Sequence, residues 1–567
     1  MYLNCVVEIP ENLTGISKKK IKGTNYIYYE HGRRYDPAKK YNVPQCTTIG
    51  KQSDLDPSMM IPNENYRKYF PDAELPDELP ESVRSACLMI GPYLVIRKVI
   101  RYYKLEEKLE EIIGKDTGLF LDLAAYAIIT ENNAGQYYPE YAYRHPLFTE
   151  GMKVYSDSKI SRFLREIKRD DAIRFQNEWN EGRDHREKVY ISYDSTNKHC
   201  QAGDIRLAEF GHEKEKGKKP IYNFSVAYDR NNRVPLFYEE YPGSINDVSQ
   251  LQFLLEKAAA YGYKNAGFIL DRGYFSEPNI NFMDRKRYDF LIMVKGCREL
   301  VKQIVLRERG TFEDEWDKSI PFYGVSGTTV RARIFKKDEQ ERFVHVYYSD
   351  YRKARERSRL ETKIQQHKEF LDGLVGSDVR VETTYTEFFE PIYYHKGQQD
   401  QRLQLIREKK DAISQAIKLC GYFAIITSSE MTAPEALELY KSRDCSEKLF
   451  RGDKSYLGER TMRGCQDEPL YTKIFVEFVA LIIRNKIYAC LKDRMKETGK
   501  KANYMTVPAA IKELSKIEMV KQADGIYRLS YAVTATQKEI LQAFNLTAAD
   551  VKKQAIELAG HLRTLTA

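Results

Sequence analysis

Four polar side chains late in the chain have a spacing that suits phosphate chemistry. They are Tyr440, Arg443, Glu447 and Lys454, with two, three and six residues between them. The first three occupy positions i, i+3 and i+7, which share one face of an α-helix. Such a face directs a carboxylate toward a metal ion, while the guanidinium holds a phosphate through two hydrogen bonds and the lysine adds a point charge. The alternative interpretation is an amphipathic helix whose charges face solvent.

Two aspartates follow short runs that are typical of buried strands. Asp194 ends the run YISYD, and Asp271 ends the run FILD. Because α/β sheets place functional groups at the carboxyl ends of their strands, we expect these carboxylates to converge. With Glu447 they form an oxygen-only ligand set that suits Mg²⁺ or Mn²⁺, and two such ions can catalyse phosphoryl transfer. For either aspartate alone, a turn or a helix cap is the alternative.

Arg272 directly follows Asp271 and is expected either to contact a phosphate or to cap the following loop.

The sequence does not support a disulfide framework or a zinc centre. Nine cysteines are scattered singly without a CxxC pair, and no HExxH segment accompanies the nine histidines. This pattern argues against a disulfide framework and against zinc.

The composition is that of a globular protein of several domains, with 567 residues, 42% hydrophobic and 31% charged. No apolar run approaches the roughly 20 residues of a membrane helix. The first ten residues lack the basic and apolar regions of a secretory signal. We therefore expect a cytoplasmic protein, nucleoid-associated in a prokaryote, with neither a membrane partner nor an organic cofactor.

Basic residues gather in two segments, 15–40 and 351–363, although the net charge of the whole chain is only +9. Clusters of this kind suit a phosphate backbone, and a solvated charged face is the alternative. The candidate DNA contacts are Lys18, Lys19, Lys20, Lys22, Arg33, Arg34, Arg352, Arg355 and Arg359.

The hydrophobic periodicity predicts a mixed α/β core that is interrupted by further strands. Core strands are predicted over residues 189–193, 221–228, 234–239, 266–270, 288–294 and 421–427. Strands of the interruption are predicted over residues 328–335, 342–348 and 380–394. Helices are predicted over residues 82–94, 105–113, 118–130, 158–169, 171–181, 247–261, 278–285, 351–374, 433–449 and 471–491.

Six regions follow from these elements. They are a small basic region that is a candidate for DNA binding (1–75), a helical region (76–185), the first part of the α/β core (186–310), a β-rich insertion (311–422), the second part of the core with Glu447 (423–495), and a C-terminal helical region (496–567).

The Tyr-(2)-Arg-(3)-Glu-(6)-Lys spacing resembles the signature of one branch of the DDE insertion-sequence transposases. The resemblance covers about residues 188–491. It implies a ribonuclease-H-like mixed sheet flanked by helices, with a β-rich insertion before the helix that bears the catalytic glutamate. The long stretch of sequence between Asp271 and Glu447 agrees with such an insertion.

The same resemblance makes residues 186–310 and 423–495 the catalytic core, residues 76–185 a candidate for transposon-end binding and residues 496–567 a candidate for dimerisation. It also implies roles for individual residues. Asp194, Asp271 and Glu447 would bind two Mg²⁺ or Mn²⁺ ions, and Tyr440, Arg443 and Lys454 would position a phosphate near the cleaved end. Relatives bind terminal inverted repeats, cut both transposon ends and join the 3′ hydroxyls to target DNA, usually as a homodimer on paired ends. Some form a hairpin at each end and hold a flipped base on a tryptophan of the insertion. Trp316 is the one tryptophan in that region, and its acidic surroundings favour a core or surface residue, with base flipping as the alternative.

Three other functions remain open at this point. A metal-dependent nuclease on the same fold uses water where a transposase uses a 3′ hydroxyl. A DNA-binding regulator derived from a transposase would be expected to lack a carboxylate, and all three are present. A glycosidase with a carboxylate pair would leave Arg443 and Lys454 without a role.

Overall fold

The computed structural model describes most of the chain. The described residues are 7–10, 13–21, 24–37, 39–52, 57–73, 75, 84–183, 187–200, 205–211, 219–245, 247–294, 299–335, 340–395, 401–443, 461–462, 466–499, 502–522 and 526–564.

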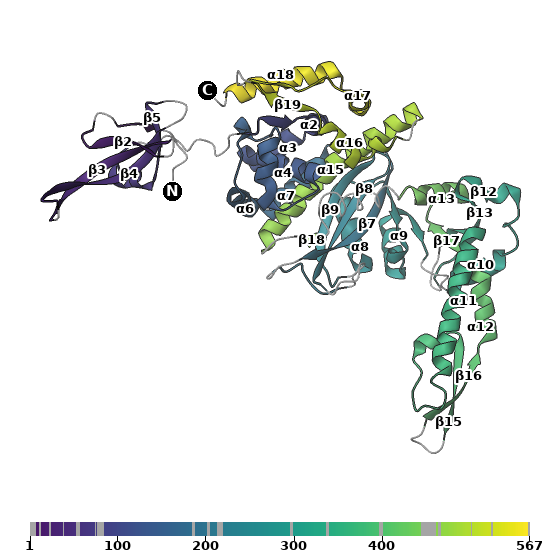
Figure 1. Cartoon of the computed structure of the whole chain (residues 1–567). Coiled ribbons are helices and arrows are strands. Elements are labelled where there is room, and N and C mark those ends of the chain that lie inside the picture. The colour runs from purple at the N-terminus through teal and green to yellow at the C-terminus, as the bar shows by residue number, and fades with distance from the viewer. Residues whose placement is uncertain are drawn as a thin grey trace.

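A ten-stranded mixed sheet lies at the centre of the molecule, in the order β12-β13-β14-β17-β11-β10-β7-β8-β9 with β18 beside β7 (Figure 1). Its core strands are β7 (Val189–Cys200), β8 (Ile221–Asp229), β9 (Val234–Pro242), β10 (Ala266–Leu270) and β11 (Asp289–Met293). β7, β10 and β11 are mutually parallel, whereas β7, β8 and β9 form an antiparallel meander. This arrangement confirms the predicted ribonuclease-H-like mixed sheet, with helices α8 (Asp247–Ala260) and α9 (Glu277–Lys286) beside it.

The sheet continues through three strands of the expected insertion, β12 to β14, and through two strands of the second part of the core, β17 and β18. Their bounds are β12 (Ser319–Ile320), β13 (Val325–Ala332), β14 (Arg342–Tyr348), β17 (Tyr422–Thr427) and β18 (Thr461–Met462). β14 pairs antiparallel with β17, and β17 pairs antiparallel with β11. The first strands of the expected insertion therefore extend the catalytic sheet.

The rest of the interruption forms an arm that leads away from the sheet (Figure 1). It contains α11 (Asp350–Asp372), α12 (Lys410–Leu419) and the hairpin of β15 (Phe389–His395) and β16 (Gln401–Glu408), with α10 (Glu299–Glu308) near its base. Leu371, Phe388 and Phe389 form its small core. The strand expected over residues 380–394 is wrong in its first half, because Thr383–Tyr385 is a 3₁₀ turn and pairing with β16 begins at Phe389.

A long helix, α15 (Asp467–Thr498), joins the sheet to a helical region. It packs on β9 and on several helices of residues 84–183. These helices are α2 (Gly91–Tyr103), α3 (Leu105–Ile113), α4 (Thr117–Thr130), α5 (Tyr138–Arg144), α6 (Asp157–Glu166) and α7 (Arg169–Glu181). The bounds predicted for α3 are confirmed to the residue.

The C-terminal region shares its hydrophobic core with this helical region. The elements are α16 (Val507–Leu514), β19 (Glu518–Lys521), β20 (Tyr527–Leu529), α17 (Ala535–Gln542) and α18 (Ala548–Thr564). β19 pairs with β6 (Cys87–Met89), and one core cluster runs from Leu88 to Leu562. The helix expected over residues 82–94 is therefore wrong before Gly91, because Leu88 is buried in a strand opposite Met519.

The first 75 residues form a five-stranded antiparallel sheet with a core of its own. Its elements are β1 (Val7–Glu8), β2 (Ile16–Ile21), β3 (Thr24–Asp36), β4 (Tyr41–Gln52), β5 (Met59–Pro62) and α1 (Glu64–Tyr69). This sheet lies apart from the rest of the molecule (Figure 1).

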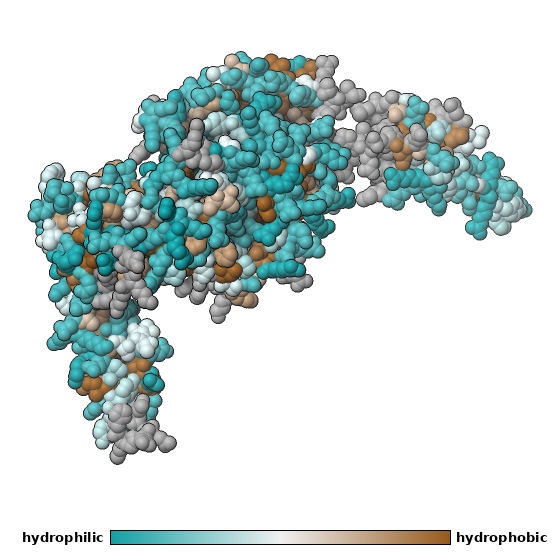
Figure 2. All heavy atoms as spheres, turned by 180° about the vertical axis from the view of Figure 1, so that it is seen from behind, coloured by the Kyte–Doolittle hydropathy of each residue, from teal (hydrophilic) through white to brown (hydrophobic). Residues whose placement is uncertain are grey.

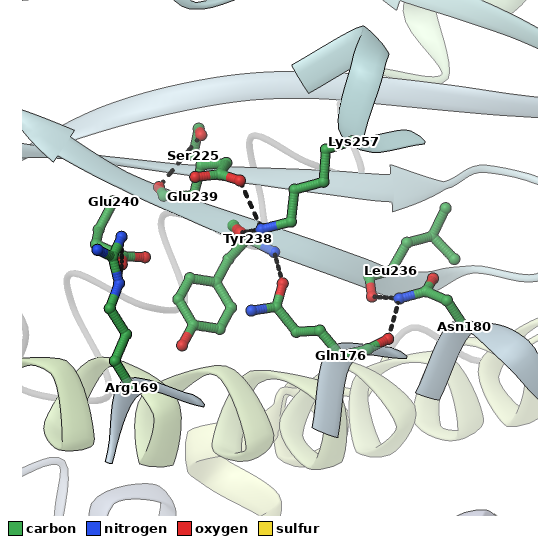
Figure 3. Close-up of polar contacts among 9 residues, drawn as sticks. All are labelled: Arg169, Gln176, Asn180, Ser225, Leu236, Tyr238, Glu239, Glu240 and Lys257. Carbon is green, nitrogen blue, oxygen red and sulfur yellow. Dashed lines mark hydrogen bonds and ion pairs between the residues drawn. The ribbon is translucent and has the colours of Figure 1, made fainter. Parts of the chain in front are cut away.

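Helix α7 covers the free edge of β9, the last strand of the central sheet (Figure 3). The amide of Asn180 donates to the carbonyl of Leu236 at 2.9 Å, and the backbone N–H of Tyr238 donates to the side chain of Gln176 at 3.1 Å. Open backbone groups on an edge strand invite pairing with another chain. These side chains satisfy such groups within the molecule.

Among the described residues, no helix is long and apolar enough to cross a membrane.

Candidate active site

The register of two parallel strands brings Asp194 and Asp271 together. Leu270, the last residue of β10, is the partner of Tyr193 in β7. The next residue on each strand is one of the two aspartates, so both follow the same rung of the sheet. The structure therefore places them as neighbours, as their positions after two buried strands predicted.

Asp194 does not end its strand, and that part of the prediction is wrong. β7 continues to Cys200 because its other edge stays paired with β8, with Asp194 opposite Val226 and His199 opposite Ile221. Asp271, in contrast, does end β10 and caps the 3₁₀ turn Arg272–Tyr274.

Each aspartate has one carboxylate oxygen held by the backbone. The N–H of Ser195 donates to Oδ1 of Asp194 at 2.9 Å, and the N–H of Arg272 donates to Oδ1 of Asp271 at 2.7 Å. The two Oδ2 atoms face the same guanidinium nitrogen, Nη1 of Arg443, at 3.8 Å and 3.7 Å. Two negative charges therefore meet one positive charge in a partly enclosed site, where the side chain of Arg443 is 12% exposed and that of Asp194 is 18% exposed.

Tyr440 supports this cluster from the last turn of α13 (Ala433–Lys441). Its hydroxyl donates to Oδ1 of Asp271 at 3.4 Å and also lies 3.6 Å from the sulfur of Met293. The guanidinium carbon of Arg443 lies 5.4 Å from the centre of the tyrosine ring, within the range of a cation–π contact. Tyr440 thus contacts both an acidic and a basic member of the site.

Helix α13 begins as its sequence suggests but ends early. Thr432 and Glu435 form a reciprocal capping box at its N-terminus. The expected helix over residues 433–449 is interrupted after Lys441, because Ser442 caps α13 and its hydroxyl donates to the carbonyl of Leu439 at 2.6 Å, and residues 444–449 lie outside the described residues. Arg443 therefore lies in a turn, not on the helical face of Tyr440, and yet it reaches the two aspartates.

Other predicted site residues differ in what the structure describes. Glu447 and Lys454 lie outside the described residues, as does Lys22. Arg272 is exposed in its 3₁₀ turn, and the group that caps this turn is the side chain of Asp271, which accepts from the backbone N–H of Arg272. Trp316 is 86% exposed, which excludes a core position.

The two basic clusters are both on the surface. Lys18, Lys19 and Lys20 are exposed on β2, and Arg33 and Arg34 are exposed on β3. Arg355 and Arg359 are exposed on α11. Arg352 is the exception, since its Nε donates to Glu356 at 2.6 Å and its guanidinium lies 4.8 Å from the ring centre of Phe423.

The donor chemistry at this site fits a hard divalent cation. Carboxylate oxygens are the ligands that Mg²⁺ and Mn²⁺ prefer, and the positive charge of Arg443 already lies where both Oδ2 atoms point. The described residues hold no cluster of three potential metal ligands. Among the described residues, Asp194 and Asp271 are thus two neighbouring carboxylates whose chemistry suits such an ion.

A buried ion pair connects the strand that carries Asp194 to helix α15. Lys198, four residues further along β7, contacts Glu477 in the middle of α15, and both side chains are fully buried. The ammonium also lies 4.4 Å from the ring centre of Phe224. Sequence reasoning missed this pair. The signal was present, because a single glutamate inside the apolar run of α15 requires a buried partner.

Comparison with known proteins identifies the class. Residues 187–483 match the family model of the transposase DDE domain, which is more than half of the chain. The chain therefore belongs to this family of DDE transposases, enzymes that cleave and join DNA and generally depend on a divalent metal ion.

No curated protein matches the chain. Among solved structures, it is similar to the piggyBac transposase in a synaptic complex with hairpin DNA. The identity is 9%, the match covers 83% of this chain and 85% of that one, and the TM-score is 0.35.

Proposed function

We propose that this transposase binds the terminal inverted repeats of a mobile element, cuts the element at its ends and joins the freed 3′ hydroxyls to target DNA. The observation that carries the proposal is the meeting of Asp194, Asp271 and Arg443 at the end of β10. Two carboxylates and a guanidinium are the groups that cleavage of a phosphodiester requires, since one set binds a metal and the other binds a phosphate.

In this proposal Asp194, Asp271 and Glu447 are the catalytic carboxylates. They would hold two Mg²⁺ or Mn²⁺ ions, which activate the attacking oxygen and neutralise the leaving oxygen. The backbone N–H groups of Ser195 and Arg272 keep one oxygen of each aspartate fixed and leave the other directed at the reacting centre.

Arg443 and Tyr440 position the DNA. The guanidinium of Arg443, which faces both aspartates, would bind the scissile phosphate, for which its planar donors are suited. The tyrosine hydroxyl orients Asp271 through their hydrogen bond. Lys454 and Arg272 add positive charge near the same phosphate. The spacing of these residues in the sequence supports membership of the Tyr-(2)-Arg-(3)-Glu-(6)-Lys branch of the family.

The regions outside the core bind DNA and a second copy of the chain in this proposal. The basic N-terminal sheet and the helical region contact the terminal repeats, and two copies assemble on paired ends in the cytoplasm. The buried face of the C-terminal region is occupied within the chain by β6 and α2, so dimer contacts would use its outer surface.

The test uses the purified full-length protein, Mg²⁺, and labelled duplexes that carry the terminal repeats flanking the coding sequence. Asp194→Asn, Asp271→Asn and Glu447→Gln should each abolish cleavage and joining while repeat binding stays intact. Glu430→Gln is the matched control, since it neutralises a carboxylate that is 75% exposed beside Arg331. Hydrolysis without joined products would indicate a nuclease, and cleavage that persists in the three variants would refute the carboxylate assignment.

A further inference from the structure

Strands β3 and β4 extend beyond the N-terminal sheet as a two-stranded ribbon. β2 pairs with β3 only over Thr24–Tyr29, and β5 pairs with β4 only over Gly50–Gln52. Residues 32–36 and 41–45 pair with each other past these limits. We call this segment, with its turn at residues 37–40, the ribbon. Among the described residues, no further strand pairs with either of its edges.

The ribbon has no hydrophobic core beneath it. The core of the N-terminal sheet consists of Val7, Ile9, Ile27, Ile49, Met60 and Tyr66, and no described ribbon residue belongs to it. Tyr35 and Tyr41 are 59% and 58% exposed. A two-stranded hairpin is only marginally stable in water. A hairpin that projects into solvent in this way is therefore a candidate for binding another molecule.

The turn of the ribbon contains two backbone hydrogen bonds to Asp36 and carries positive charge. The backbone N–H groups of Lys39 and Lys40 donate to the carbonyl of Asp36 at 3.2 Å and 2.9 Å. Both lysines are exposed, and so are Arg33 and Arg34 on the strand before the turn. The ribbon thus carries four cationic side chains and one acidic side chain, Asp36, and Nε of Arg33 also contacts Glu30 at 2.7 Å. The tip of the ribbon is hydrophilic (Figure 2).

The strand register divides the side chains between two faces. Arg33 and Tyr35 lie opposite Pro44 and Asn42, whereas Arg34 lies opposite Val43 on the other face. Gln45, opposite Gly32, shares the face of Arg34. Arginine, asparagine and glutamine are the side chains that form paired hydrogen bonds with the edges of guanine and adenine. Each face of the ribbon therefore carries groups that can read bases.

We propose that the ribbon enters the major groove of duplex DNA and reads the sequence of the terminal repeat. The major groove is about 12 Å wide and admits a two-stranded ribbon. Five residues per strand span about 17 Å, enough to contact several base pairs. Lys39, Lys40 and the basic residues of β2 would contact phosphates on either side of the groove. This inference rests on the proposed function, since it takes the same terminal repeats as the ligand.

The first test measures the contacts of the ribbon with phosphates separately from its contacts with bases. Affinities of the full-length protein for a terminal-repeat duplex and for a scrambled duplex are measured by fluorescence anisotropy between 50 and 200 mM salt. Lys39→Ala/Lys40→Ala should weaken binding to both duplexes at least several-fold and lower the salt slope by about two. Lys552→Ala/Lys553→Ala removes two exposed charges from α18 and is the control. An unchanged salt slope in the ribbon variant would overturn the inference.

The second test addresses the groove and the bases. Asn42→Ala and Gln45→Ala should lower the preference for the repeat over the scrambled duplex about tenfold in at least one case, with the salt slope unchanged. A repeat duplex with 7-deazapurines lacks N7 acceptors in the major groove and should lose the same preference with the wild-type protein. Since these side chains are on the surface, circular dichroism should show unchanged folding.

The outcomes distinguish this inference from the proposed function. Groove reading by the ribbon would be refuted if Asn42→Ala and Gln45→Ala both keep the wild-type preference for the repeat over the scrambled duplex. It would also be refuted if the wild-type protein binds the 7-deazapurine duplex as tightly as the unmodified repeat. Neither result affects the cleavage test, which is scored on DNA products and on the three carboxylate variants. Loss of cleavage with intact discrimination would in turn leave the ribbon assignment in place.

Discussion

The ion pair between Lys198 and Glu477 predicts a large and asymmetric effect of mutation on stability. Both side chains are fully buried, and they join the strand of Asp194 to helix α15. Removing one partner leaves a charge in the interior without compensation, which typically costs about 3–5 kcal/mol. Glu477→Gln and Lys198→Met should each lose about this amount. For a domain of about 150–250 residues, each kcal/mol corresponds to about 2–4 °C in Tm.

Replacing both partners should behave differently. Lys198→Met/Glu477→Leu removes both charges and keeps similar side-chain volumes, so that its stability should return to within about 1–2 kcal/mol of the wild type or exceed it. The control is Asp493→Asn, on the same helix, whose partner Arg233 lies at 2.6 Å with both side chains more than 40% exposed. An exposed pair contributes about 0–1 kcal/mol.

The assay is thermal and urea unfolding of the full chain, followed by circular dichroism and by fluorescence of the buried Trp179. Single variants that lose less than about 1 kcal/mol, or a double variant whose loss equals the sum of the singles, would refute the reasoning, because either result means that the pair is solvated. Cleavage by the double variant gives a second readout. Activity near that of the wild type would show that the pair is not needed to orient Asp194.

Four further predictions concern single residues. Burial raises the pKa of Asp122 to about 7, so that the folded state binds the proton more tightly than the unfolded state does. The contribution of this group to stability therefore falls as pH rises from 3.8 to about 7. Asp122→Asn should remove this dependence when the free energy of unfolding is measured against pH. Burial lowers the pKa of His345 from 6.5 to about 4, so that its contribution to stability is lost as pH falls from 6.5 to about 4. His345→Gln should therefore make the free energy of unfolding less dependent on pH in that range. Arg443→Ala should lower the cleavage rate about 10²–10³-fold, with Arg443→Lys recovering only part, while repeat binding changes only a few-fold in gel-shift assays. Tyr440→Phe removes only a hydroxyl and should slow cleavage about tenfold with unchanged Tm, and an unaltered rate would contradict its role in orienting Asp271.

Much of the local structure could be predicted because its signals lie within short windows. The apolar spacing of α3 and the alternating strands of the β8–β9 hairpin are local patterns, and both elements form where they were expected. The capping box of Thr432 and Glu435 likewise sets the start of α13 through hydrogen bonds within one turn. Periodicity did not predict where α13 stops, since Ser442 and Arg443 fit the helical pattern of the sequence but lie in a turn in the structure.

The sequence by itself determined which groups are available for chemistry, namely two aspartates after buried strands and a basic and aromatic segment further on. Only the tertiary structure decided their arrangement. The pairing of Leu270 with Tyr193 sets Asp194 beside Asp271, and the turn after α13 brings Arg443 within 4 Å of both. The pairing of β6 with β19 and the contact of Lys198 with Glu477 are likewise long-range. Such contacts depend on the complementarity of whole surfaces and on the entropy of closing long loops, which no short window of sequence contains.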